Sequence, residues 1–452
     1  MTLPLLRKTH PAEGLLKVIG SLLLTALLSV SLASCGGGAT SASVTPGPTP
    51  STVSISPTSP TMGIGSNLQF SATISGQSST AVNWQVNGVA GGNSSVGTID
   101  STGFYIAPAS MPSTGSITIT AVSQADSTQT ANDAVTLAST DPLGAVTASS
   151  TISCLSGGIS GSTCYSLTVS CPGIADLTTF LKVNVPATPK GTVLFATGVG
   201  GPTLYDSTWQ YGSDAVQNVL SAGFTTVQLA FGTPFNTPNN GWLTGPGGVR
   251  RLACRYATVA QWVFQNIQNA NSSLPVCATG NSGGASAIAY AITHYGLDSL
   301  FSYVEPTSGP PLNRLDYGCI CNGASVDTPC GNGSLPLCYS SALKAIVDLS
   351  YSTPYCEQSD PSNTSNQARL LSDSLDSPGA NYTYPKTGVN VVYGGLDGSV
   401  AVSQGLEWYN QVSAVNSPAA AQCVSDAPHE MPSVLDAATT IASNLTSNCV
   451  LH

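Results

Sequence analysis

One serine in this sequence lies in a pattern that suits nucleophilic chemistry. Ser282 stands in Gly280-Asn281-Ser282-Gly283-Gly284, directly after the short apolar run 275–278 and directly before a small-residue segment, 285–292, that we expect to be a helix. The pattern predicts a strand, a sharp turn and a helix, because glycines beside the serine permit a turn too tight for side chains. The N–H groups that begin the helix would face a negative oxygen formed at the turn.

A serine hydroxyl needs a base to accept its proton, and the histidines restrict which base it has. The chain has four, His10, His294, His429 and His452, and His10 lies in a segment that we expect to be removed. No histidine then precedes Ser282, although its motif resembles the Gly-Asp-Ser-Gly-Gly box of trypsin-like proteases. The orders His-Asp-Ser and Asp-His-Ser are therefore excluded, and the order serine, acid, histidine remains.

We predict His429 as the base, because it lies in a loop directly before the last expected helix, 433–444. His294 lies twelve residues after the serine, on the helix that leads away from it, and His452 is the terminal residue. Asp397 is the predicted acid. It follows the expected strand 389–393 and precedes His429 by 32 residues.

Two alternatives for the acid remain open at this point. Asp397 could be only a turn residue beside Gly398, and Glu305 competes from the end of the preceding strand, 300–305. The backbone N–H of Gly283 is one predicted donor to the oxyanion. We expect the second donor in the glycine loop after the buried strand 191–197, at Val199 or Gly200.

The motif, the residue order and the strand context make residues 145–452 resemble the α/β hydrolases. The resemblance implies an α/β fold and acyl transfer by Ser282, Asp397 and His429, with no metal and no organic cofactor. The segment 309–385 is too long for a simple connection and corresponds to the position where these enzymes carry a cap. It is rich in cysteine, which predicts a disulfide-rich cap insertion: Cys319, Cys321, Cys330, Cys338 and Cys356.

The first 35 residues are typical of a targeting segment. Arg7, Lys8 and Lys17 precede the apolar run 18–30, and Leu32-Ala33-Ser34-Cys35 resembles a bacterial lipobox, whose cysteine is lipidated. We therefore expect a signal peptide over 1–35 and a lipid anchor on Cys35 that holds the protein at the cell envelope or extracellular face of a bacterial membrane. The alternative is an ordinary transmembrane anchor, which the short apolar run disfavours. Residues 36–52 are predicted to be a flexible linker.

Residues 53–139 show short alternating segments separated by turn residues, which predicts a small all-β sandwich of seven strands. One of these segments is 68–74, and Trp84 in another is placed like a core tryptophan. The stretch 96–108 resembles bacterial Ig-like repeats. The resemblance implies a spacer, with carbohydrate binding as the alternative.

The cysteine count predicts disulfides. Thirteen cysteines are present, and without Cys35 twelve remain, enough for six bridges outside the cytoplasm. We predict one bridge between Cys423 and Cys449, which lie on either side of His429 in the sequence. Zinc binding is disfavoured because the cysteine and histidine spacings lack the usual metal hooks.

Composition excludes some partners but names no substrate. Charged residues make up 8% of the chain and its net charge is −10, so no basic patch for nucleic acid is expected. No Lys-Ser or Lys-Thr follows the glycine loop at 198–201, which argues against a phosphate-binding loop.

We expect a serine carboxylesterase that cleaves environmental esters, including polymeric polysaccharide esters and polyesters. The alternatives are a serine peptidase or amidase, and a non-catalytic cell-surface binding protein that uses its Ig-like domain.

Overall fold

The computed structural model describes residues 51–232, 241–331, 333–416 and 419–452. The predicted signal peptide, the lipidation site Cys35 and nearly all of the predicted linker lie outside these residues. Among the residues described, no helix is long and apolar enough to cross a membrane.

The regular elements of residues 52–138 are all strands, arranged as a five-stranded sheet of order β2-β11-β10-β5-β6, a four-stranded sheet of order β3-β9-β8-β7 and the pair β1-β4. The strands are β1 (Thr52–Ser56), β2 (Thr61–Gly63), β3 (Asn67–Gln69), β4 (Ser71–Ser75), β5 (Val82–Val86), β6 (Val89–Ala90), β7 (Gly92–Asn93), β8 (Gly97–Ile99), β9 (Phe104–Ile106), β10 (Ser116–Ser123) and β11 (Thr130–Ala138). Trp84 is buried in their shared core, as predicted.

The single strand predicted over 68–74 is wrong. The chain divides it at Phe70, so that β3 joins the four-stranded sheet and β4 pairs with β1. Phe70 is fully buried, and its N–H donates to the carbonyl of Gly103 at 2.8 Å, one residue beyond the last β3–β9 pair. The predicted segment thus serves two sheets, with the buried Phe70 between them.

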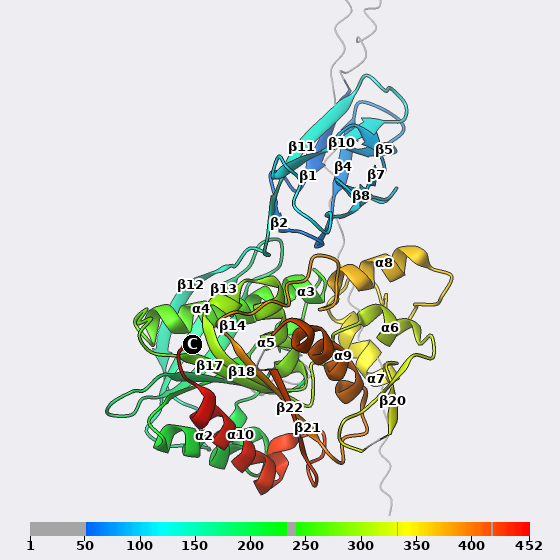
Figure 1. Ribbon diagram of the computed structural model, residues 1–452. Coiled ribbons are helices and arrows are strands. Elements are labelled where there is room, and N and C mark those ends of the chain that lie inside the picture. The colour runs from blue at the N-terminus through cyan, green and yellow to red at the C-terminus, as the bar shows by residue number, and fades with distance from the viewer. Residues whose placement is uncertain (1–50, 233–240, 332, 417–418) are drawn as a thin grey trace, which may run out of the picture. The chain divides into compact units, whose positions relative to one another are not determined.

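A mixed nine-stranded sheet of order β12-β13-β14-β16-β15-β17-β18-β21-β22 organises the rest of the chain (Figure 1). The first three strands are antiparallel, and the pairs from β16 to β22 are parallel. The strands are β12 (Ala145–Ile152), β13 (Thr163–Ser170), β14 (Leu177–Asn184), β15 (Thr192–Ala196), β16 (Thr225–Phe231), β17 (Val276–Asn281), β18 (Phe301–Thr307), β21 (Gly388–Gly394) and β22 (Ala419–Val424). The predicted α/β class is confirmed for this part of the chain.

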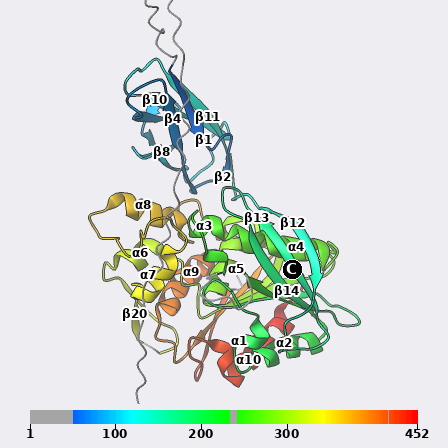
Figure 2. The same cartoon turned by 180° about the vertical axis from the view of Figure 1, so that it is seen from behind.

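The sequence did not predict β12, β13 and β14, which form one edge of this sheet (Figure 2). β12 is almost entirely exposed or half-buried, so its sequence lacks an apolar face that periodicity could detect. The edge strand β22 was missed for the same reason.

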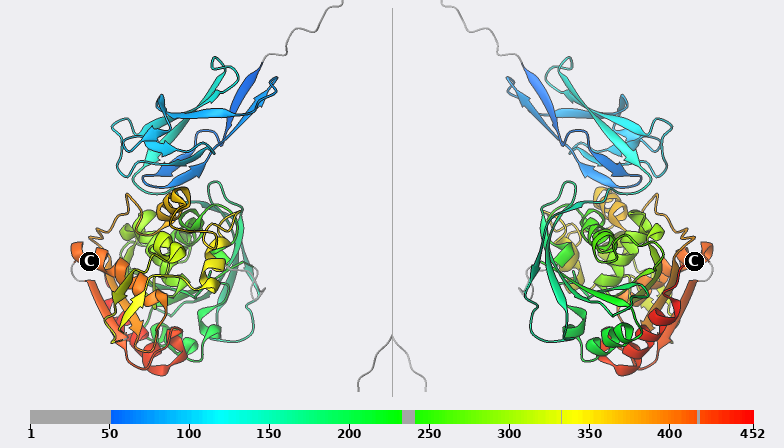
Figure 3. Two further views of the ribbon diagram at one scale, coloured as in Figure 1. Left: turned by 90° about the vertical axis from the view of Figure 1, so that its right-hand side faces the viewer. Right: turned by 90° about the vertical axis from the view of Figure 1, so that its left-hand side faces the viewer.

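Helices cover both faces of the sheet. One face carries α2 (Gly212–Ser221) and α10 (Leu435–Asn448), which pack side by side (Figures 1 and 3). The other face carries α4 (Cys254–Asn266), α5 (Gly283–His294) and α9 (Val400–Val415). Shorter helical segments complete this part of the chain: α1 (Tyr205–Thr208), η1 (Gly241–Leu243), α3 (Val249–Leu252), η2 (Leu297–Ser299) and η3 (Met431–Ser433).

Between β18 and β21 the chain forms three helices and a hairpin. They are α6 (Leu315–Ile320), the strands β19 (Ser325–Asp327) and β20 (Ser334–Pro336), α7 (Ser341–Asp348) and α8 (Thr364–Asp373). Two disulfides, Cys319–Cys356 and Cys321–Cys338, lie within this insertion.

The described residues form six disulfides, the number that the twelve cysteines allow, but the predicted Cys423–Cys449 bridge is wrong. Cys449 pairs with Cys277 of β17, and Cys423 of β22 pairs with Cys330 of the insertion. Cys277 and Cys449 are both buried in the core between α10 and the sheet, so the tail after α10 meets β17 instead of returning to β22. The remaining bridges are Cys154–Cys164 and Cys171–Cys254.

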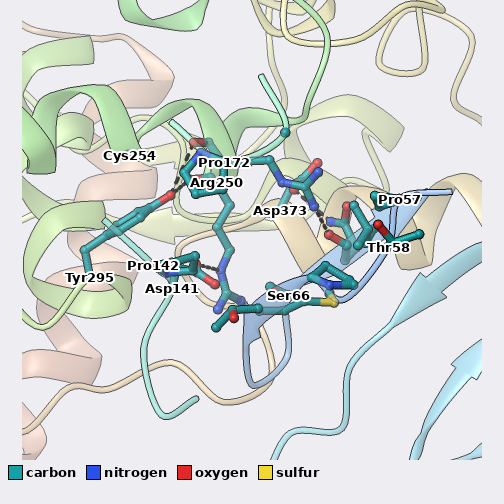
Figure 4. Close-up of a pocket in the computed structure, with 17 residues that line it drawn as sticks. Pro57, Thr58, Ser66, Asp141, Pro142, Pro172, Arg250, Cys254, Tyr295 and Asp373 are labelled. Atoms are coloured by element: carbon teal, nitrogen blue, oxygen red, sulfur yellow. Dashed lines mark hydrogen bonds and ion pairs between the residues drawn. The ribbon is translucent and has the colours of Figure 1, made fainter. Parts of the chain in front are cut away.

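Polar contacts join the all-β residues to the insertion and to α3. The side chain of Asn67 donates to Asp373 Oδ1 at 2.8 Å, and Arg250, which also pairs with Asp141 at 2.6 Å, donates from Nη2 to the carbonyl of Ile64 at 2.9 Å. A cavity of about 230 Å³ lies beside these residues (Figure 4). Of the described residues that line it, none is a predicted site residue.

Candidate active site

Ser282 occupies the turn between β17 and α5 in a conformation that ordinary residues avoid. Its backbone angles are φ 54° and ψ −113°. Its N–H donates to the carbonyl of Thr307 at 2.9 Å, and its own carbonyl accepts from Ser286 N–H at 3.0 Å. A strained backbone held by bonds on both sides is a common property of functional sites.

The glycines of the motif are required by packing. A Cβ atom on Gly283 would lie 1.6 Å from the carbonyl oxygen of Val199, and one on Gly284 would lie 2.7 Å from that of Thr197. A Cβ on Gly280 would lie 2.7 Å from the backbone of Gly284. Glycine is thus required at these three positions because backbone atoms of neighbouring segments lie too close for a Cβ atom.

The glycine loop after β15 lies beside Ser282. A Cβ on Gly198 would lie 3.5 Å from the Cβ of Ser282, and Val199 has a positive φ of 54°. The loop is held by a bond from Gly201 N–H to Gly198 O and another from Trp242 N–H to Gly200 O, each 2.9 Å. The three predicted oxyanion residues are therefore neighbours of the turn, and the N–H of Gly283, as the first of α5, has no partner within the helix.

Asp397 and His429 form a hydrogen-bonded pair. Asp397 lies in the loop after β21 with 2% of its surface exposed, and its Oδ2 is 2.9 Å from Nδ1 of His429. Ser399 adds a contact at 3.2 Å from its hydroxyl to the same nitrogen, and its N–H donates to Asp397 Oδ1 at 2.9 Å.

The pair shifts both pKa values. Burial of His429 opposes its charged form, but the hydrogen bond and charge of Asp397, with the charge of Glu430, raise its pKa above the ordinary value of 6.5. Burial of Asp397 acts to raise its pKa, but the bonds from His429 and Ser399 and the charge of His429 lower it overall. The carboxylate therefore stays ionised and stabilises a protonated imidazole.

Asn281 connects the turn to the histidine loop, a contact that the sequence did not predict. Its Nδ2 donates to the carbonyl of His429 at 3.1 Å, and its Oδ1 accepts from the N–H of Met431 at 3.3 Å. A polar residue in a buried strand directly before the proposed nucleophile was the available signal.

The competing residues lie elsewhere. Glu305 is fully buried and accepts from Tyr303 Oη at 3.0 Å and from Asn390 Nδ2 at 3.4 Å, and burial raises its pKa to about 8. His294 ends α5, as expected, and its Nε2 is 3.0 Å from the carbonyl of Leu375, while burial lowers its pKa. Their bonding partners lie outside the Ser282 turn.

Two observations delimit the site. Among the described residues, the hydroxyl of Ser282 has no hydrogen-bond partner. A bond between this hydroxyl and the imidazole of His429 is therefore not part of this structure. In the same part of the chain, no group of three or more histidine, cysteine or acidic residues lies together as metal ligands do.

No protein-family model and no curated protein sequence matches the chain. Among solved structures it is similar to a dienelactone hydrolase from Anabaena variabilis (15% identity, TM-score 0.37), over 64% of this chain and 96% of that one. It is also similar to acetyl xylan esterase 1 from Thermoanaerobacterium sp. (14% identity, TM-score 0.43, 66% and 87%) and to Est1E from Butyrivibrio proteoclasticus (9% identity, TM-score 0.38, 63% and 98%). At these TM-scores the similarity carries no argument for an activity.

Proposed function

We propose that this protein is a serine hydrolase that cleaves carboxylic esters through Ser282, His429 and Asp397. The observation that carries the proposal is the bonding of Asn281, which joins the loop of His429 to the turn of Ser282 while Asp397 holds the imidazole. Nucleophile, base and acid thereby come from three turns at the same edge of one sheet.

The reaction proceeds by acyl transfer. Nε2 of His429 accepts the proton of Ser282 as the serine oxygen bonds to the ester carbonyl carbon. The resulting oxyanion accepts hydrogen bonds from the N–H of Gly283 and from Val199 or Gly200 in the glycine loop. Collapse breaks the bond to the alcohol, which leaves with the proton from His429.

Water completes the cycle. His429 accepts a proton from a water molecule that attacks the acyl-enzyme, and the acid leaves as Ser282 regains a proton from His429. Asp397 stays ionised throughout and keeps Nδ1 protonated, so that Nε2 is free to act.

The substrate class that we propose is an ester outside the cytoplasm, including acylated polysaccharides and polyesters. Six disulfides support an oxidising compartment. We also propose that Cys35 carries a lipid anchor and that the all-β residues act as an Ig-like spacer. Membrane fractionation of the full chain against its Cys35→Ala variant tests the anchor, which requires that the variant leave the membrane fraction.

A panel of nitrophenyl esters of increasing acyl length tests the activity. Wild-type protein should hydrolyse at least the short esters, and Ser282→Ala should lose about 10³-fold or more in kcat while keeping its circular dichroism spectrum. A nitroanilide with the same acyl group, cleaved faster than the ester, would favour the peptidase alternative. Equal rates in variant and wild type would refute the enzyme assignment.

A further inference from the structure

The side chain of Asn281 contacts the backbone of the loop that carries His429. We propose that Asn281 is a positioning residue, whose carboxamide sets where the imidazole stands relative to Ser282. This inference rests on the proposed function, and it assigns to the residue beside the nucleophile a role separate from that of the acid.

The carboxamide is matched to the loop at two points. Nδ2 donates to the carbonyl of His429 at 3.1 Å, and Oδ1 accepts from the N–H of Met431 at 3.3 Å. The N–H of Met431 also donates to the carbonyl of His429 at 3.0 Å, so the primary amide adds a donor and an acceptor to a turn that is already closed by a bond of its own. These partners also fix which end of the amide is oxygen and which is nitrogen.

The amide is itself held from β18. The hydroxyl of Thr307 donates to Asn281 Oδ1 at 3.0 Å and lies 3.3 Å from the carbonyl of Gly280. The carbonyl of Thr307 accepts from the N–H of Ser282 at 2.9 Å. One residue of β18 thus fixes both the turn of the nucleophile and the amide, and Asn281 has only 1% of its surface exposed.

His429 is therefore held in two ways. Asp397 and Ser399, from the loop after β21, contact the ring at Nδ1. Asn281, from β17, contacts the backbone on either side of Glu430. Asp397 governs the charge and tautomer of the imidazole, whereas Asn281 governs its place, so loss of the amide should lower kcat with little change in KM.

Asn281→Asp is the most informative variant, because it keeps the size of the side chain and makes the contact with the carbonyl of His429 depend on pH. Position 281 is only 1% exposed, so burial should raise the pKa of the introduced carboxyl from about 4 into the working range. A protonated carboxyl can still donate to the carbonyl of His429, whereas an ionised one places negative charge against that oxygen. The titratable groups facing this region are Asp397 and Glu430 beside the imidazole and Glu305, two residues before Thr307 on β18. All three are shared with wild type, so a new alkaline decline would come from the substitution.

We expect kcat/KM of Asn281→Asp to fall by on the order of 10²-fold at alkaline pH relative to wild type, the loss expected for a displacement of about 1 Å. At acid pH the difference should shrink. On the acid side of the pH profile, the midpoint of the fall in kcat/KM that reports the titration of His429 should stay the same as in wild type. Thr307→Val, which removes only the hydroxyl that holds Oδ1, should lower kcat by roughly tenfold.

Asn416 provides a matched control at the end of α9. Its Oδ1 accepts from the N–H of Tyr384 at 2.6 Å and its Nδ2 donates to the carbonyl of Tyr382, the same pairing with a loop backbone. Asn416→Asp should alter the melting temperature but leave the pH profile of kcat/KM unchanged.

The measurement is the pH profile of kcat and KM for wild type and the three variants on one nitrophenyl ester, with circular dichroism at each pH. An alkaline decline in Asn281→Asp alone supports the proposal. A folded Asn281→Asp with the wild-type profile overturns it. If that variant does not fold, Thr307→Val decides, since an unchanged kcat would overturn the proposal. Absence of hydrolysis in wild type would instead refute the proposed function.

Discussion

The turn at Ser282 and the insertion at 309–385 are held in shape by different means. The turn is fixed by close backbone contacts, with carbonyl oxygens of neighbouring segments where Gly283 and Gly284 would carry Cβ atoms. The insertion is held by covalent bonds, two within it and a third from Cys330 to β22. Close local packing restricts the residue types at neighbouring positions, so it can be recognised in the sequence. A disulfide between distant positions requires only two cysteines, and their pairing cannot be recognised in this way.

This difference predicts which property a substitution will affect in each region. Changes near the turn should alter the reaction in a folded protein, and changes to the bridges of the insertion should alter stability. The following variants separate the two regions.

The largest effect is expected at the acid. Asp397→Asn should lower kcat by about 10⁴-fold, because an amide at this position favours the wrong tautomer of His429. Steady-state kinetics on a nitrophenyl ester measures it. Glu305→Gln is the control: burial raises the pKa of Glu305 to about 8, so it is mostly neutral at pH 7 and glutamine resembles that form. A larger loss of kcat in Glu305→Gln than in Asp397→Asn would show that the catalytic acid is Glu305 of β18.

The second-largest effect is expected from adding a methyl group at the turn. Gly283→Ala would place a Cβ 1.6 Å from Val199 O, so the glycine loop must move. We expect a loss in kcat of on the order of 10² to 10³, the effect of losing an oxyanion donor. Gly323→Ala in the insertion is the matched change: its φ is +82°, but a Cβ there meets no atom within 4 Å. Kinetics should show normal kcat in Gly323→Ala, and a loss in both variants would contradict the distinction.

The same contrast explains what the sequence could predict. The order of Ser282, Asp397 and His429 and the flanking glycines follow from local patterns. The strands before Ser282 and Asp397 were recognisable by their apolar runs, whereas β22, which precedes His429, was not. Asn281 was not recognised, because its partners lie near residue 429 and contact between distant segments has no local pattern. The pairing of Cys449 with Cys277 was missed for the same reason, since it depends on the path of α10 across the sheet.

Stability should respond to the bridge between the insertion and β22. Replacing both Cys330 and Cys423 by serine opens a loop of 93 residues. The chain-entropy model assigns such a loop about 4.6 kcal/mol of unfolding free energy. Removing Cys154–Cys164, which are 10 residues apart, should cost only about 2.7 kcal/mol. Urea unfolding compares them. Below its transition the first variant should keep its kcat, and a hundredfold loss in folded protein would place the bridge in the reaction.

The smallest effect concerns pH. His429 must be neutral to accept a proton, and Asp397 and Glu430 raise its pKa above 6.5 despite burial. The kcat/KM of wild type should therefore fall on the acid side, about tenfold per pH unit below a midpoint that lies above 6.5. A midpoint clearly below that value would show that the imidazole lacks its carboxylate partner.

Labelling by a fluorophosphonate tests the central claim most directly. The reagent should phosphonylate Ser282 of folded protein with loss of esterase activity, and peptide mapping by mass spectrometry should find a single adduct, absent from Ser282→Ala. Asp397→Asn should react far more slowly, because His429 no longer activates the hydroxyl. Full activity in labelled protein, or an adduct on another serine that accounts for the inactivation, would contradict the assignment of Ser282 as the nucleophile.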